Sequence, residues 1–140
     1  MSALDGRCLC GAVRITVRDP KPAVSACHCS MCRRWSGSAF MGFVAPADGV
    51  TVEGPVKTYA SSSFAERAWC DRCGSNLWFR DIGKDYELSP GLFEAAADFP
   101  LTREVYADRA MRACRFAGDH QRVTRAEYEQ RNLFVEGDAP

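Results

Sequence analysis

The stretch WCDRCGSN, at residues 69–76, carries two cysteines separated by two residues and followed by a glycine. This spacing lets the thiolates of Cys70 and Cys73 bend onto one metal ion, and Gly74 permits the tight turn behind the second cysteine. The stretch is therefore predicted to be a zinc knuckle. A closed zinc site takes four protein ligands, so two more must come from elsewhere in the chain.

The two further ligands are predicted in the segment RCLCG, at residues 7–11. Side chains alternate along an extended segment, so Cys8 and Cys10 point the same way. Two pairs of cysteines then make a four-thiolate site that joins the first strand to a segment about 60 residues later. Because such a site closes a long loop, we expect the loss of one ligand to damage folding.

A third group of cysteines lies in the segment ACHCSMCRR, at residues 26–34. Cys27 and Cys29 share one face of an extended segment, and Cys32 returns one turn later. Three protein ligands leave one position of the metal open, as in catalytic zinc sites. A soft, electron-rich site of three thiolates suits a sulfur ligand, so we expect these three cysteines to be catalytic and a substrate thiol to take the fourth position.

Two residues offer an alternative in which this second site is closed. His28 lies between two of the cysteines, although ligation by adjacent residues would strain the backbone, and the only other histidine is His120. Cys114 stands alone in the sequence, and a lone cysteine is more often a small buried apolar residue. A closed site completed by His28 or Cys114 therefore stays open as the second interpretation.

The composition bounds the class of protein. The 140 residues fit one domain, residues 1–140, and the 18 basic and 18 acidic residues leave no net charge, which argues against a dedicated nucleic-acid binder. No apolar run approaches the roughly 20 residues of a membrane span, and the N-terminus has no apolar stretch of signal-peptide length. We therefore expect a cytoplasmic protein, in which eight tightly grouped cysteines favour metal binding over disulfides.

Strand patterns dominate the chain. In residues 12–19 the apolar side chains of Val13, Ile15 and Val17 alternate with polar ones. Further short β-rich segments, separated by turn residues, lie at residues 39–46, 50–54, 56–61, 65–70, 77–80, 85–89 and 103–108. Together they predict a mainly β protein built on antiparallel sheet.

Helices are predicted at only two places. One follows the third cysteine group and ends at Gly37. The other begins near the C-terminus, where Thr124 and Glu127 form a capping box. Residues 135–140 are expected to fray.

Three segments in order, RCLCGAVRITV, CHCSMCRRWSGSAF and WCDRCGSNLWF over residues 7–79, resemble the glutathione-dependent formaldehyde-activating enzyme family, which includes centromere protein V-like proteins. The resemblance implies a mainly β, Mss4-like fold, also called a β-tent. It implies one structural zinc and a second zinc, with the ligands Cys8, Cys10, Cys70 and Cys73 for the first and Cys27, Cys29 and Cys32 for the second. It also implies that glutathione adds to formaldehyde to give S-hydroxymethylglutathione.

Two candidate substrate contacts follow the third cysteine group. Arg33 or its neighbour Arg34 could bind the carboxylates of a glutathione-like thiol, because the guanidinium fork suits carboxylates; the alternative is that one simply faces solvent. Ser38 follows Gly37 in a tight turn near the metal, where backbone donors could reach a substrate. A plain turn is the alternative there.

The resemblance weakens beyond Phe79. Many members of the family carry a histidine and then a tryptophan in the last third, whereas residues 100–116 contain neither, and Arg103 and Glu104 stand near the histidine's place. The expected function is a zinc-dependent carbon–sulfur lyase or thiol adduct-forming enzyme that acts on a glutathione-like thiol and a small aldehyde. The alternative is a non-enzymatic zinc-binding module that binds a protein partner.

Overall fold

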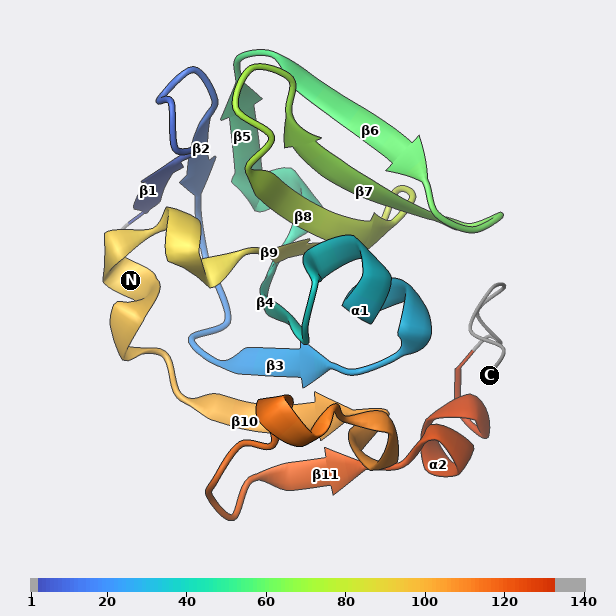
Figure 1. The fold of residues 1–140 in the computed structure, drawn as a ribbon. Coiled ribbons are helices and arrows are strands. Elements are labelled where there is room, and N and C mark those ends of the chain that lie inside the picture. Colours follow the sequence, from blue (N-terminus) through green and yellow to red (C-terminus); the bar gives the residue numbers. More distant parts are fainter. Residues whose placement is uncertain (1–2, 133–140) are drawn as a thin grey trace. The chain divides into compact units, whose positions relative to one another are not determined.

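Eleven β-strands and two short α-helices form the secondary structure of residues 3–132, the part of the chain that the computed structural model describes (Figure 1). The prediction of a mainly β fold with few short helices is confirmed. The expected fraying of residues 135–140 lies outside the described residues.

The described residues fall into two units. The first comprises residues 3–23 and Gly42–Pro100, and the second comprises Val24–Met41 and residues 101–132. Strand β4 (Phe40–Ala45) begins in the second unit and continues into the first. That the whole chain is one domain stays a prediction.

The first unit contains a three-stranded antiparallel sheet in the order β1-β2-β5 (Figure 1). Its strands are β1 (Leu4–Arg7), β2 (Arg14–Val17) and β5 (Val50–Glu53). The alternation predicted for residues 12–19 is confirmed, because Val13, Ile15 and Val17 are all buried in the core of this unit. Strand β1 is too short and too polar to stand out in the sequence.

A second set of strands in the first unit follows the order β4-β9-β8-β7-β6, with every neighbouring pair antiparallel. The remaining strands of this set are β6 (Val56–Ala60), β7 (Ala65–Cys70), β8 (Asn76–Asp81) and β9 (Tyr86–Leu88). The ring of Phe43 lies edge-on against Phe93 and Phe99, at centroid distances of 5.2 and 5.5 Å. Phe43 and Phe93 belong to the apolar core that also contains Cys8 and Cys70.

The second unit contains three parallel strands in the order β11-β10-β3 (Figure 1). They are β3 (Val24–Cys27), β10 (Leu101–Val105) and β11 (Gln121–Val123). The sequence predicts only antiparallel sheet, and this part of the fold differs from that prediction. Parallel neighbours need long connections, and the side-chain alternation from which strands are predicted is the same for both directions.

Both predicted helices are confirmed. Helix α1 (Ser30–Ser36) ends at Gly37, which adopts the left-handed conformation and donates its N–H to the carbonyl of Arg33 at 2.8 Å. Helix α2 (Arg125–Glu129) begins with the predicted capping box between Thr124 and Glu127. The short 3-10 helices are η1 (Ala47–Gly49), η2 (Pro90–Leu92), η3 (Glu94–Asp98), η4 (Ala107–Arg109) and η5 (Arg112–Cys114). Among residues 3–132, no helix has the length and apolar character needed to cross a membrane.

Candidate metal centres

Four cysteine sulfurs of the first unit lie within 4.8 Å of one another, namely those of Cys8, Cys10, Cys70 and Cys73. The Sγ atom of Cys10 lies 3.6 Å from that of Cys8 and 3.9 Å from that of Cys70. A tetrahedral site with metal–sulfur bonds of about 2.3 Å separates its sulfurs by roughly 3.8 Å. The four-cysteine cluster, as we call this group, can therefore hold a metal ion with the dimensions that zinc requires.

Two backbone turns aim these sulfurs at a common point. Cys70 ends strand β7, and the chain reverses through Gly74, which has a positive φ of 77° and donates to the carbonyl of Cys70 at 2.8 Å. The carbonyl of Cys8 accepts from Gly11 at 3.1 Å in the other turn. The N–H of Leu9 donates to the hydroxyl of Ser75 at 3.0 Å and so ties the two turns together.

The thiols of this cluster differ in acidity. A hydrogen bond from the hydroxyl of Ser75, 3.2 Å from the sulfur, is the main cause that lowers the pKa of Cys73 to about 5. The backbone of Ala12 lowers the pKa of Cys10, but desolvation and the neighbouring thiols outweigh that effect and raise it to about 11. Four thiolates this close repel one another, and a cation among them would favour the ionised form of all four.

Three cysteine sulfurs of the second unit, those of Cys27, Cys29 and Cys32, also lie within 4.8 Å of one another. Cys27 ends β3, and Cys29 is the N-cap of α1. The sulfur of Cys29 accepts the backbone N–H of Cys32 at 3.3 Å, and both side chains are buried. The strand-to-helix junction therefore brings the predicted three cysteines together, and we call them the three-cysteine cluster.

The closed alternative for this second site is not supported by the described residues. Neither His28 nor Cys114 belongs to the group of mutually close ligand atoms among residues 3–132. The Nε2 atom of His28 instead lies 2.6 Å from a carboxylate oxygen of Glu104. Three cysteine sulfurs therefore meet without a fourth protein ligand among residues 3–132.

The three-cysteine cluster raises the pKa of one of its own thiols. Hydrogen bonds to Cys29 and Cys32, together with desolvation, hold the pKa of Cys27 well above its usual range. A metal ion on these sulfurs would replace the thiol protons, so metal uptake here should release protons.

The two predicted substrate contacts lie together. Arg33 and Ser38 line one small hollow in the second unit, together with His28, Ala39, Met111 and Cys114. Arg33 is half-buried, whereas Arg34 faces solvent, so the structure separates the two arginines that the sequence leaves equivalent. Cys114, in η5, also lines this hollow.

Sequence reasoning missed a buried polar group beside this site. The carboxylate of Glu104 contacts the Nε2 atoms of both His28 and His120. The sequence carried one signal of this group. A glutamate stands inside a strand pattern, and glutamate is seldom fully buried; the chain has only two histidines as polar partners for it. Nothing in the sequence shows that residues 76 positions apart meet.

The fold and the two cysteine clusters define a mainly β protein with two candidate metal centres. Residues 3–109 match the sequence profile of the glutathione-dependent formaldehyde-activating enzyme family. The chain belongs to this family, as its sequence resemblance predicts, and has the family's Mss4-like fold.

Two curated relatives are similar over most of their length. A Schizosaccharomyces pombe protein named as an uncharacterised lyase is 37% identical over 111 residues, which cover 77% of this chain and 81% of the relative. A Halomonas elongata protein, provisionally named a glutathione-dependent formaldehyde-activating enzyme, is 38% identical over 110 residues, or 71% of this chain and 69% of the relative. A crystal structure of a Rhodobacter sphaeroides protein, 23% identical, matches with a TM-score of 0.54 over 71% of this chain and all of that one, and supports the fold alone.

Proposed function

We propose that this protein is a zinc-dependent carbon–sulfur lyase that joins a glutathione-like thiol to a small aldehyde such as formaldehyde, and that it also catalyses the reverse cleavage. The observation that carries the proposal is the three-cysteine cluster, in which three sulfurs lie within 4.8 Å of one another. Three protein ligands leave an exchangeable position, as catalytic zinc sites do. The family and the names of the relatives support the same class of reaction.

The two clusters are assigned different roles. Cys8, Cys10, Cys70 and Cys73 would enclose a structural zinc ion, because four thiolates leave no position for a substrate. Cys27, Cys29 and Cys32 would hold the second ion. Zinc bound there would act as a Lewis acid that lowers the pKa of a thiol filling its open position.

The reaction balances without any redox partner. The thiol sulfur forms a bond to the carbonyl carbon of the aldehyde, the carbon–oxygen π bond opens, and the thiol proton ends on the new hydroxyl oxygen. Cleavage returns the same proton and breaks the same carbon–sulfur bond. The protein's contribution is to hold the two reactants in contact, which removes much of the entropic cost of a bimolecular step.

Two residues of the small hollow are proposed to orient the thiol. The guanidinium of Arg33, half-buried at the end of α1, is the candidate partner for a carboxylate of a glutathione-like substrate. Ser38 lines the same hollow directly after the turn at Gly37, and it is the candidate for a polar contact with the same molecule.

The rate of adduct formation tests the proposal. Glutathione and carbon-13 formaldehyde are mixed with the zinc-loaded protein, and exchange between free and thiol-bound carbon is measured by NMR. We expect exchange faster than the uncatalysed rate for the wild type and the uncatalysed rate for Cys32→Ser. A wild type that matches the uncatalysed rate would contradict the enzyme proposal and favour a non-enzymatic zinc module that binds a protein partner.

A further inference from the structure

Three buried polar side chains meet in the second unit, beside the three-cysteine cluster. The Nε2 atom of His28 lies 2.6 Å from Oε1 of Glu104, and the Nε2 atom of His120 contacts Oε2 of the same carboxylate. The side chains of His28, Glu104 and His120 are 2%, 3% and 6% exposed. One carboxylate therefore bridges two imidazoles almost completely out of contact with solvent.

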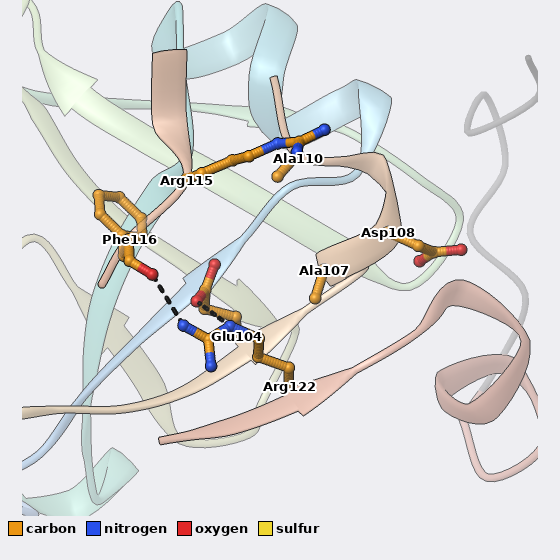
Figure 2. Close-up of a pocket in the computed structure, with 7 residues that line it drawn as sticks. All are labelled: Glu104, Ala107, Asp108, Ala110, Arg115, Phe116 and Arg122. Carbon is orange, nitrogen blue, oxygen red and sulfur yellow. Dashed lines mark hydrogen bonds and ion pairs between the residues drawn. The ribbon is translucent and has the colours of Figure 1, made fainter. Parts of the chain in front are cut away.

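The carboxylate of Glu104 is the acceptor in this group. Burial alone would raise the pKa of Glu104, but hydrogen bonds from His120 and His28 outweigh it and lower that pKa below its usual range. Arg122 adds a guanidinium whose Nε atom lies 3.4 Å from Oε2 (Figure 2). These partners satisfy the buried carboxylate of Glu104. Removing one of them would leave a buried polar group without a partner, which destabilises the folded state.

His28 connects this group to the candidate metal ligands. It stands between Cys27 and Cys29 in the chain, and its backbone N–H donates to the carbonyl of Val105 at 3.1 Å. Its side chain is held by Glu104, the residue before Val105 on strand β10. Both the backbone and the side chain of this one residue are thus fixed to adjacent residues of the neighbouring strand.

We propose that Glu104 is a positioning residue for the three-cysteine cluster. By holding the imidazole of His28, it fixes the backbone between Cys27 and Cys29 and so sets the direction of their sulfurs. The inference rests on the proposed metal at that cluster. Residues that orient the ligands of a metal commonly change its affinity about 10–100-fold when they are removed.

Glu104 is also among the residues that line a cavity of about 460 Å³, and another of these residues provides a control. Figure 2 shows the residues that line it, namely Glu104, Ala107, Asp108, Ala110, Arg115, Phe116 and Arg122. Asp108 is a second acidic residue of this lining, and its carboxylate accepts a hydrogen bond from the backbone N–H of Arg125 at 2.8 Å. Asp108→Asn therefore neutralises another acidic residue of the same lining and keeps an oxygen acceptor for Arg125.

The test measures the release of metal from the three-cysteine cluster rather than the rate of the reaction. Zinc is kept at the four-cysteine cluster, cobalt is loaded at the three-cysteine cluster, and the rate at which a chelator removes cobalt is measured with the cobalt absorption spectrum. We expect Glu104→Gln to release cobalt about tenfold faster and to shift its ligand-field bands. Asp108→Asn should release it at the wild-type rate, and zinc at the four-cysteine cluster should be unaffected in both variants.

Variants of His28 show whether Glu104 acts through it. His28→Leu should accelerate cobalt release as Glu104→Gln does, whereas His28→Gln keeps an N–H donor for Glu104 and should restore slow release. If Glu104 acts through His28, the double variant of Glu104→Gln with His28→Leu is no faster than His28→Leu alone. The His28 pair decides the question even if Glu104→Gln fails to fold.

The outcomes separate this inference from the proposed function. If the wild type binds cobalt and Glu104→Gln has the same cobalt release rate and spectrum as the wild type, the positioning role of Glu104 is overturned and the proposed function is not. Additive effects in the double variant, or no difference between His28→Leu and His28→Gln, also overturn it. A wild type that takes up no metal at the three-cysteine cluster overturns both the inference and the proposed function.

Discussion

The Sγ atoms of Cys10 and Cys70 lie 3.9 Å apart, although 60 residues separate them in the chain. An ion on these sulfurs and on those of Cys8 and Cys73 would cross-link the turn that follows β1 to the end of β7 and the turn after it, and so would close a long loop. The three-cysteine cluster spans only residues 27–32. Because the entropy of closing a loop grows with its length, the two clusters should contribute very differently to folding.

The first prediction compares one cysteine from each cluster. Cys70→Ser should leave the protein insoluble or lower its melting temperature strongly, because structural zinc contributes about 10–16 kcal/mol in zinc-finger peptides and a domain's net stability is about 5–15 kcal/mol. Cys29→Ser should give a folded protein that has lost its second metal. Thermal melts decide between them, with Cys114→Ser as the control outside both clusters. If Cys29→Ser is the less stable of the two, the structural and exchangeable roles are reversed.

The second prediction concerns metal content. The protein should purify with between one and two zinc ions, and a mild chelator should remove the ion of the three-cysteine cluster first. Four thiolates enclose the other ion, and its release requires unfolding of the segments that hold it. Metal analysis before and after chelation measures both populations. A single inert ion per chain, held by cysteines of both clusters, would be incompatible with this assignment.

The third prediction is a pH dependence at helix α2. The carboxylate of Glu127 accepts the backbone N–H of Thr124 at 3.0 Å, and this bond is the main cause that lowers the pKa of Glu127. A folded-state pKa below the unfolded value stabilises the helix at pH values above the unfolded pKa. That stabilisation is lost as the pH falls through the lowered folded-state pKa.

Amide hydrogen exchange at α2 measures this effect. Protection should fall on acidification in the wild type, whereas Glu127→Gln keeps an oxygen acceptor for Thr124 without a titrating group and should show a flatter profile. Equal pH profiles for the two proteins would show that Glu127 does not carry the dependence.

The cysteine pairs and the three-cysteine cluster could be predicted from sequence because ligand spacing is local, and the joining of two distant pairs follows from the four ligands that a closed zinc site needs. Cys70 and Cys73 stand at a spacing that chelates one ion. The sequence predicts Cys8 and Cys10 on one face of an extended segment, whereas in the structure they lie in a turn, which still brings their sulfurs together. The capping box at Thr124 is local in the same sense. Ligand spacing and capping chemistry depend on a few neighbouring residues, so the structure shows the predicted capping box and brings the predicted cysteines together, while metal binding by them stays a prediction.

The parallel strands and the buried network could not be predicted in that way. Strands β3 and β10 form a parallel pair between segments more than 70 residues apart in the chain. The alternation of side chains within either strand does not indicate which strand lies next to it. His28 and Glu104 meet for the same reason. Such contacts depend on the tertiary arrangement of the second unit rather than on any local pattern.

Cobalt substitution at the three-cysteine cluster tests the central claim most directly, because a thiolate ligand to cobalt gives a charge-transfer band. If the cluster of Cys27, Cys29 and Cys32 holds a metal with one exchangeable position, adding glutathione should increase that band as a further sulfur is bound. Glutathione can instead strip the metal, in which case the band fades. A band that fades or stays unchanged, with adduct formation at the uncatalysed rate, would contradict the proposed enzyme.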